Sequence, residues 1–180
     1  VLTFHLMDEG LDSGPIIMKE DFQLKDDTYI GEVYDWLYKK IPYGFLKSVI
    51  MLTEGCSLRK QKGNVLRVFP RKPEDSRLNF QKDLDWNYKL IRASSRPFSG
   101  AYAFLNNTEF KVTIFRAQRQ EIDYEFLAVS GQILEKFNFD KSFFLAIGNQ
   151  VLKVIDYSVN NKTIDTSFEV VCKSMRNRLT

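Results

Sequence analysis

Apolar positions in the first 55 residues predict two short strands followed by a helix. Residues 1–7 form a short apolar run, and apolar residues resume at 16–18 after a segment rich in turn residues. Residues 26–28 (Asp-Asp-Thr) offer capping groups and negative charge at the start of a run with helical spacing. Pro42 should kink or end that helix, so a second helical piece is expected over residues 45–55. Strand followed by helix is typical of the edge of an α/β domain.

Beyond residue 80 the pattern changes to a short helix beginning at Asp83 and then to strands. The predicted strands are residues 101–105, 110–115, 125–129, 132–137, 142–147, 150–157 and 167–172. Gly148-Asn149 between two of them suits a type II′ turn. About seven short strands in roughly 80 residues predict a small β-barrel or sandwich.

Residues 56–79 lie between these two regions and are rich in basic side chains. They include Arg59, Lys60, Lys62, Arg67, Arg71, Lys72 and Arg77. We interpret this segment as a solvated linker between domains 1–55 and 80–180, and a strip that contacts phosphates is the alternative. Residues 79–180 hold 14 basic and 11 acidic residues, so the second region is only weakly basic. The basic tail from Lys173 to Arg178 is expected to be mobile and solvated.

Composition excludes several classes of protein. Of 180 residues, 44% are hydrophobic and 27% charged, and the net charge is +3, which is typical of a folded globular chain. No apolar run approaches the roughly 18 residues that span a bilayer, so we expect no membrane partner. Two distant cysteines and one histidine exclude a disulfide scaffold and a histidine- or cysteine-based metal site, and we expect a reducing, cytoplasmic location. Val1 lies inside an apolar run, which we interpret as the C-terminal part of a longer protein.

The chemically most informative segment follows the first predicted strand. His5 and three carboxylates (Asp8, Glu9 and Asp12) lie within eight residues, around a glycine-containing turn. Loops at strand ends commonly carry catalytic groups in α/β folds, and a carboxylate beside an imidazole can orient it for proton transfer. Ordinary turn chemistry remains the alternative explanation of the same residues.

Several segments resemble the folate-dependent formyltransferases, a superfamily that includes methionyl-tRNA formyltransferase and sugar-nucleotide N-formyltransferases. Residues 3–17 (TFHLMDEGLDSGPII) look like the motif that closes the catalytic domain of that superfamily. Residues 90–93 (LIRA) and 97–102 (PFSGAY) are similar to the entry into its C-terminal domain. Residues 131–134 (GQIL) and 146–152 (AIGNQVL) are similar to later segments of that domain, in the family's order.

The resemblance implies a fold and a set of site residues. The fold would be the trailing strand–helix edge of a Rossmann-like catalytic domain, followed by a small OB-like β-barrel. The resemblance implies that Asp12 is the catalytic aspartate, that His5 supports it, and that residues 8–11 (Asp8, Glu9, Gly10 and Leu11) line the pocket for 10-formyltetrahydrofolate. It requires no metal. The family's Asn-x-His pair has no counterpart here, so we expect residues 1–180 alone to be inactive.

The acceptor of the formyl group remains open between two branches of the family. Residues 69–76 (FPRKPEDS) resemble the sugar-nucleotide branch, and the weak positive charge is low for a tRNA-binding protein. We therefore favour a primary amine of an amino-sugar nucleotide, with initiator tRNA as the alternative. A non-catalytic OB-like binding or dimerisation module is the alternative of another class; its aromatics Tyr102, Phe104, Phe110 and Phe115 could stack on nucleic acid, although aromatics at strand spacing more often form the core. A homodimer is also left open.

Overall fold

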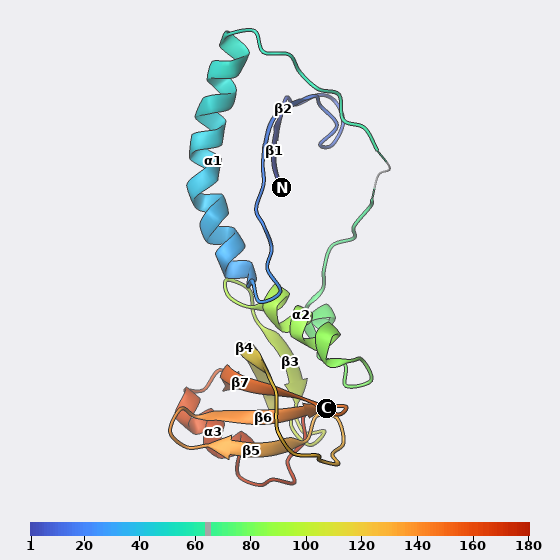
Figure 1. The fold of residues 1–180 in the computed structure, drawn as a ribbon, viewed down its shortest axis with the longest axis vertical. Helices are drawn as coiled ribbons and strands as arrows, with labels where there is room; N and C mark the ends of the chain where they lie inside the picture. Colours follow the sequence, from blue (N-terminus) through green and yellow to red (C-terminus); the bar gives the residue numbers. More distant parts are fainter. Residues whose placement is uncertain (64–65) are drawn as a thin grey trace. The chain divides into compact units, whose positions relative to one another are not determined.

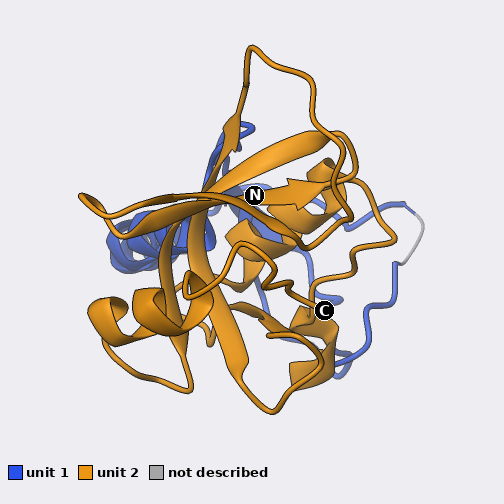
Figure 2. Ribbon diagram, turned by 90° about the horizontal axis from the view of Figure 1, so that it is seen from below, with its two compact units in different colours: residues 1–70 blue, residues 71–180 orange. Residues whose placement is uncertain are grey.

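The computed structural model describes residues 1–63 and 66–180 (Figure 1). The contacts divide the chain into two compact units, unit 1 with residues 1–70 and unit 2 with residues 71–180 (Figure 2). The segment 56–79, interpreted as a linker, is thus shared between them, and residues 64–65 of it lie outside the described residues.

Unit 1 consists of two strands and one long helix. Strands β1 (Leu2–His5) and β2 (Ile16–Glu20) pair in antiparallel fashion, and α1 (Ile30–Thr53) packs on them. The helix begins where the backbone N–H of Tyr29 donates to the Glu32 carboxylate at 2.8 Å. The ring of Phe4 lies on Gly44, because a Cβ built at Gly44 would be 2.3 Å from that ring. Only a glycine allows β1 to approach α1 this closely.

The predicted break of this helix at Pro42 was wrong. Helix α1 continues through Pro42 as one element of 24 residues. A proline removes one backbone hydrogen bond, here to the carbonyl of Tyr38, and Tyr38 is exposed, so water can replace it. The turns after Pro42 are held by the packing of Gly44 and by the Ser48 hydroxyl, which donates to the Gly44 carbonyl at 2.7 Å. Tertiary contacts therefore outweigh the local cost of the proline.

Unit 2 begins with the short helix η1 (Pro73–Ser76) and with α2 (Leu84–Ser94). The helix predicted from Asp83 is confirmed, since the Asp83 carboxylate accepts a hydrogen bond from the backbone N–H of Trp86 at 2.7 Å. Asn87 is fully buried, and its amide exchanges hydrogen bonds with both backbone groups of Asn79. Trp86, in the first turn of α2, is 40% exposed.

A five-stranded antiparallel sheet forms the core of unit 2. Its strands are β3 (Ala101–Phe104), β4 (Lys111–Gln120), β5 (Ile133–Phe137), β6 (Ser142–Ile147) and β7 (Gln150–Val159), in the spatial order β3-β4-β7-β6-β5. Every residue of β6 is buried. The turn at 148–149 is confirmed, with Gly148 at φ +61°, the sign that a type II′ turn requires at its first position.

The closed barrel expected from the sequence is not formed by the described residues, because two of its predicted strands are absent. Residues 125–129 are not a strand, and residues 167–172 belong largely to helix α3 (Ile164–Val171). The buried residues of α3, namely Ser167, Phe168 and Val171, follow helical spacing although the segment is rich in β-branched residues. The sheet therefore keeps two edge strands, β3 and β5.

Residues 177–180, which overlap the end of the basic tail (Lys173 to Arg178) that was expected to be mobile, make backbone contacts with both edges of the sheet. Thr180 exchanges two backbone hydrogen bonds with Phe104 at the end of β3, and the N–H of Leu179 donates to the Gly131 carbonyl before β5 at 2.7 Å. Leu179 is fully buried. Gly131 has φ +90°, and a Cβ there would be 2.1 Å from the Leu179 carbonyl oxygen. This segment, which we call the edge clasp, thus replaces part of the missing barrel closure.

Candidate active-site loop in unit 1

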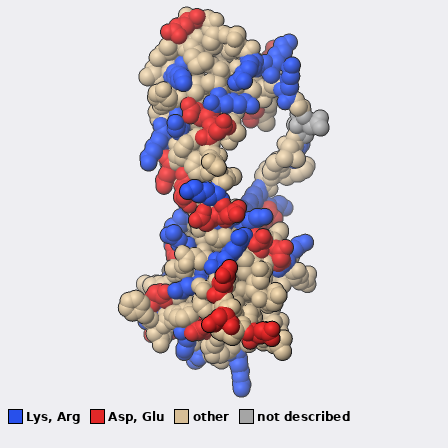
Figure 3. All heavy atoms as spheres, viewed as in Figure 1, with Lys and Arg blue, Asp and Glu red and all other residues tan. Residues whose placement is uncertain are grey.

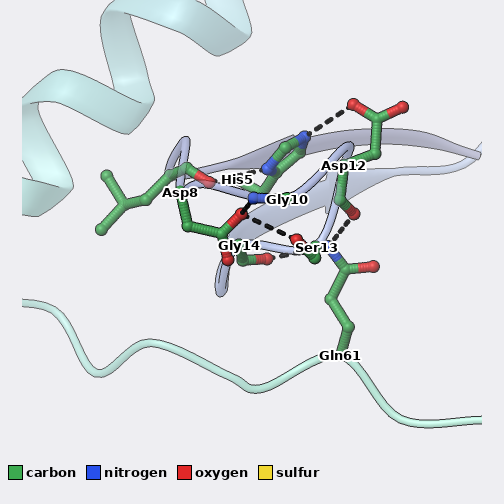
Figure 4. A network of polar contacts seen from close by, with 8 residues as sticks. His5, Asp8, Gly10, Asp12, Ser13, Gly14 and Gln61 are labelled. Atoms are coloured by element: carbon green, nitrogen blue, oxygen red, sulfur yellow. Dashed lines mark hydrogen bonds and ion pairs between the residues drawn. The ribbon is translucent and has the colours of Figure 1, made fainter.

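The loop between β1 and β2 is closed at its base by backbone contacts. The N–H of Leu6 donates to the Pro15 carbonyl at 3.0 Å, and the strand register shifts between Phe4 and His5. A Cβ built at Gly14 would be only 1.8 Å from the Leu6 carbonyl oxygen. Glycine at position 14 therefore allows the two ends of the loop to meet. This contact closes the base of the loop that carries Asp8 and Asp12 (Figure 4).

The loop brings together His5 and Asp12, as the sequence predicts. The Nε2 atom of His5 lies 3.5 Å from the Oδ1 atom of Asp12, and the two point toward each other in Figure 4. His5 Nδ1 donates to the Leu6 carbonyl at 2.8 Å, since that oxygen can only accept. Nε2 therefore carries a hydrogen toward Asp12 only in the imidazolium form. Asp12 adopts φ +53° and its side chain is 82% exposed, so its carboxylate is open to a ligand.

Asp8 has a different place from Asp12, because its carboxylate turns inward on the loop. One oxygen, Oδ1, accepts hydrogen bonds from the backbone N–H of Gly10 at 3.1 Å and from the Ser13 hydroxyl at 2.7 Å. This arrangement is a local turn in which the aspartate replaces a backbone acceptor. Glu9 and Leu11 are exposed and make no such contact within the described residues. The structure therefore groups His5 with Asp12, and gives Asp8 a supporting role.

Gln61 is a contributor that the sequence did not suggest. Its Nε2 atom donates to the backbone carbonyls of both Asp12 and Gly14, at 2.7 and 2.8 Å. Nearby, Arg59 exchanges two backbone hydrogen bonds with Ile16 at the start of β2. These contacts hold the Asp12 backbone in its positive-φ conformation from a segment about fifty residues later, and no local pattern marks a glutamine for such a task.

Exposed apolar side chains lie beside the polar turn of this loop. The side chains of Met7 and Leu11 are 93% and 95% exposed, on both sides of the polar turn at residues 8–10. A cavity of about 330 Å³ between β1 and α1 is lined mainly by apolar groups and includes His5 and Phe45. Apolar surface beside a few fixed polar groups is the usual composition of a small-molecule site. The residues present thus fit one side of a folate.

Ionisable groups elsewhere in the described chain serve other purposes. No group of three or more His, Cys, Asp or Glu side chains in residues 1–63 and 66–180 is arranged to hold a metal ion. In unit 2, hydrogen bonds from Lys153 and Ser142 hold the pKa of Asp140 at about 2. Burial raises the pKa of Cys172 to about 11 and also raises that of Tyr157.

In the described part of the chain, no helix is both long and apolar enough to cross a membrane.

Comparisons of sequence point to one kind of enzyme. A protein of Syntrophomonas wolfei named methionyl-tRNA formyltransferase is 29% identical over 162 residues, which cover 86% of this chain and 48% of that relative. A protein of the same name from Rickettsia massiliae is 27% identical over 151 residues, covering 82% of this chain and 46% of the relative. The chain spans about half the length of these curated relatives. No protein-family model matches it.

Two solved structures share the fold of much of this chain. HypX from Aquifex aeolicus in complex with tetrahydrofolic acid is 15% identical, with a TM-score of 0.64, over 89% of this chain and 27% of that one. Methionyl-tRNA formyltransferase from Clostridium thermocellum is 24% identical, with a TM-score of 0.53, over 66% of this chain and 50% of that one. Together, the sequence relatives and these likenesses of fold support the assignment of the chain to the folate-dependent formyltransferase superfamily.

Proposed function

We propose that the whole protein transfers a formyl group from 10-formyltetrahydrofolate to the amine of methionyl-tRNA, and that the β1–β2 loop is part of its reaction site. The observation that carries the catalytic part is the His5–Asp12 pair on a loop fixed by Gly14. The tRNA acceptor is supported by the names of the sequence relatives. The amino-sugar acceptor favoured by the sequence finds no such support, so the alternative becomes the main proposal.

The chain's own residues would act on the proton of the attacking amine. The Leu6 carbonyl fixes the His5 ring through Nδ1, and Nε2 faces Asp12. The exposed Asp12 carboxylate would accept that proton as the amine attacks the formyl carbon, and an imidazolium at His5 would stabilise the carboxylate before the transfer. The bond between the formyl carbon and N10 of the folate then breaks, and the proton taken up by Asp12 passes to N10, so that tetrahydrofolate leaves. When bound, 10-formyltetrahydrofolate supplies the formyl group. A positioned acid or base of this kind accelerates such a step by roughly 10²–10⁴-fold.

The predictions on the activity of residues 1–180 alone, the folate contacts, the location and the oligomeric state remain predictions from the sequence. His5 is the single histidine, and we expect residues 1–180 alone to be inactive, because catalytic groups that act as a unit fail when members are missing. The residues 8–11 as folate contacts, a cytoplasmic location and a homodimer also stay predictions.

The variant Asp12→Asn in the whole protein tests the catalytic proposal. We expect kcat/KM for formylation to fall by about 10²-fold or more, with the pH profile of kcat altered and the fold unchanged by circular dichroism. The matched control is Asp35→Asn on α1, an exposed aspartate outside the loop, which should leave the rate unchanged. Unchanged turnover of Asp12→Asn would overturn the assignment and leave the non-catalytic module as the better explanation.

The acceptor is tested separately, with the same wild-type enzyme and donor. Methionyl-tRNA and a UDP-linked 4-amino sugar are offered in parallel, and formylated product is measured by mass spectrometry. We expect product from methionyl-tRNA. Product only from the amino sugar would overturn the acceptor proposal without affecting the role of Asp12.

A further inference from the structure

The positive charge of unit 2 is low for a protein that binds tRNA. On the face seen in Figure 3, Lys and Arg side chains are interspersed with Asp and Glu and form no extended basic area. Proteins that hold nucleic acid by charge alone need several phosphate contacts. A weakly basic unit therefore needs more specific contacts to bind RNA, such as an aromatic side chain that stacks on a base and one or two arginines that contact phosphate.

Unit 2 contains a cavity of about 800 Å³ with such a composition. Its walls come from four segments of this unit: η1 with the following loop, the first turn of α2, the residues before β5, and the edge clasp. The volume falls within the range of about 300–1,000 Å³ that is usual for small-molecule sites. Phe80 and Trp86 supply aromatic surface, Arg77 and Arg178 supply charge, and Asn79 and Gln81 supply amides.

Three polar side chains at this cavity have no protein partner. The guanidinium of Arg178, the side-chain amide of Gln81 and the indole N–H of Trp86 make no hydrogen bond or ion pair with any residue in ranges 1–63 and 66–180. Trp86 is 40% exposed although the neighbouring residues Leu84 and Asn87 are buried. All three side chains are exposed, so their donors are open to solvent and are available to a ligand with a flat face and several acceptors.

The backbone that carries these groups is held rigidly. Asn106 and Arg178 exchange two hydrogen bonds, from the Asn106 backbone N–H to the Arg178 carbonyl at 2.7 Å and from the Arg178 N–H to the Asn106 side chain at 2.8 Å. The N–H of Leu78 donates to the Tyr102 carbonyl of β3 at 2.8 Å, and the Arg77 guanidinium lies 5.3 Å from the Phe104 ring centroid. A site on fixed backbone binds with little loss of conformational entropy.

The acidic residues of the cavity narrow the class of ligand. Glu74 and Asp75 also line it, and Asp75 is already bonded to the backbone N–H of Lys72 at 2.7 Å. With two acidic and two basic residues, the cavity has no net positive charge to attract a bare polyanion, whereas a nucleobase has donors as well as acceptors on its edge. We propose that this cavity binds one nucleotide unit, with the base on Trp86 and its phosphate on Arg178, either at an unpaired position of an RNA or in a free nucleotide sugar.

This inference deepens the proposed function by giving the acceptor a binding site in unit 2, and it is tested by binding rather than by formylation. Trp36 and Trp86 are the two tryptophans, so a Trp36→Phe background makes Trp86 the sole reporter. The probes are UDP-glucose, a single-stranded RNA hexanucleotide, and ribose 5-phosphate, which has the phosphate without a base. We expect saturable quenching of Trp86 fluorescence by at least one of the first two probes and none by ribose 5-phosphate.

The variant Arg178→Ala should weaken that binding about tenfold, and Arg176→Ala is the matched control, since Arg176 is exposed in the same segment but does not line the cavity. In calorimetry, Trp86→Ala should weaken binding by about fivefold or more, the loss typical of a stacking ring. Tighter binding of the RNA identifies an RNA position as the source, and tighter binding of UDP-glucose identifies a nucleotide sugar.

Other results overturn the inference. One is the absence of quenching by both base-containing probes up to about millimolar concentration. Another is binding that is equal in the Arg178→Ala and Arg176→Ala variants, or quenching by ribose 5-phosphate as strong as that by the nucleotides. None of these results bears on Asp12, so failure here and failure of the catalytic proposal are distinguishable.

Discussion

Replacing Leu179 by alanine should destabilise unit 2 far more than the position of this residue in an irregular segment suggests. Leu179 is fully buried, and its backbone bonds to Gly131 seat it beside the core. Removing a buried leucine side chain costs about 2–5 kcal/mol, depending on how well the cavity collapses. Because the edge clasp is held on both sides, at Phe104 and at Gly131, we expect little collapse and a loss in the upper half of that range.

Urea unfolding followed by Trp86 fluorescence in the Trp36→Phe background measures this loss, since Trp86 lies in unit 2. The matched control is Leu127→Ala, because Leu127 is fully exposed and its truncation should change the free energy of unfolding by no more than about 0.5 kcal/mol. A loss below about 1 kcal/mol for Leu179→Ala would refute the view that the clasp is part of the core.

Two further substitutions have calculable outcomes. Gly14→Ala places a Cβ against the Leu6 carbonyl, which cannot move freely, so it should lower the free energy of unfolding of unit 1 by about 1–3 kcal/mol. Gly10→Ala places its Cβ against the movable side chain of Ser13 and should lower that free energy by less. Equal losses would contradict the close approach of Gly14 to the Leu6 carbonyl. Asp140→Asn should cost about 1 kcal/mol at neutral pH, less than the roughly 2.4 kcal/mol implied by its lowered pKa because this side chain is 38% exposed. Because folding lowers the pKa of Asp140, its ionised carboxylate stabilises the folded protein at pH values above the usual pKa of 3.8. The difference in unfolding free energy between wild type and variant, measured by urea titration, should therefore shrink as the pH falls from about 4 to 2. A difference that persists at pH 2 would exclude the ion pair with Lys153 as its source.

The strands of the sheet in unit 2 could be predicted from the sequence where local and tertiary preferences agree. Strands β3, β4, β5, β6 and β7 were anticipated from β-rich apolar runs, with Gly148 marking the tightest turn. The failures lie where the two preferences conflict. Residues 167–172 carry β-branched residues, yet helical burial of Phe168 and Val171 decides their state, and residues 125–129 are apolar but largely exposed, as at Leu127.

In the candidate site, the contact within one short segment could be predicted from the sequence, and the long-range contact could not. The pairing of His5 with Asp12 could be anticipated, because His5 ends β1 and Asp12 lies on the short loop that follows, whose glycines allow it to fold back. The contribution of Gln61 could not, because it comes from a residue about fifty positions away and depends on how the chain returns to β2. Long-range hydrogen bonds to backbone carbonyls have no sequence signature, since any donor of suitable length can make them.

The edge clasp has a consequence for the order of events during synthesis. Residues 177–180 are translated after every strand of the sheet, so the backbone bonds to Phe104 at the end of β3 and to Gly131 before β5 form only after the clasp has left the ribosome. Unpaired strand edges are templates for pairing with other chains. A nascent chain that ends shortly after Val159 therefore holds every strand of the sheet while the backbone groups at the end of β3 and before β5 are still open to pairing with another chain.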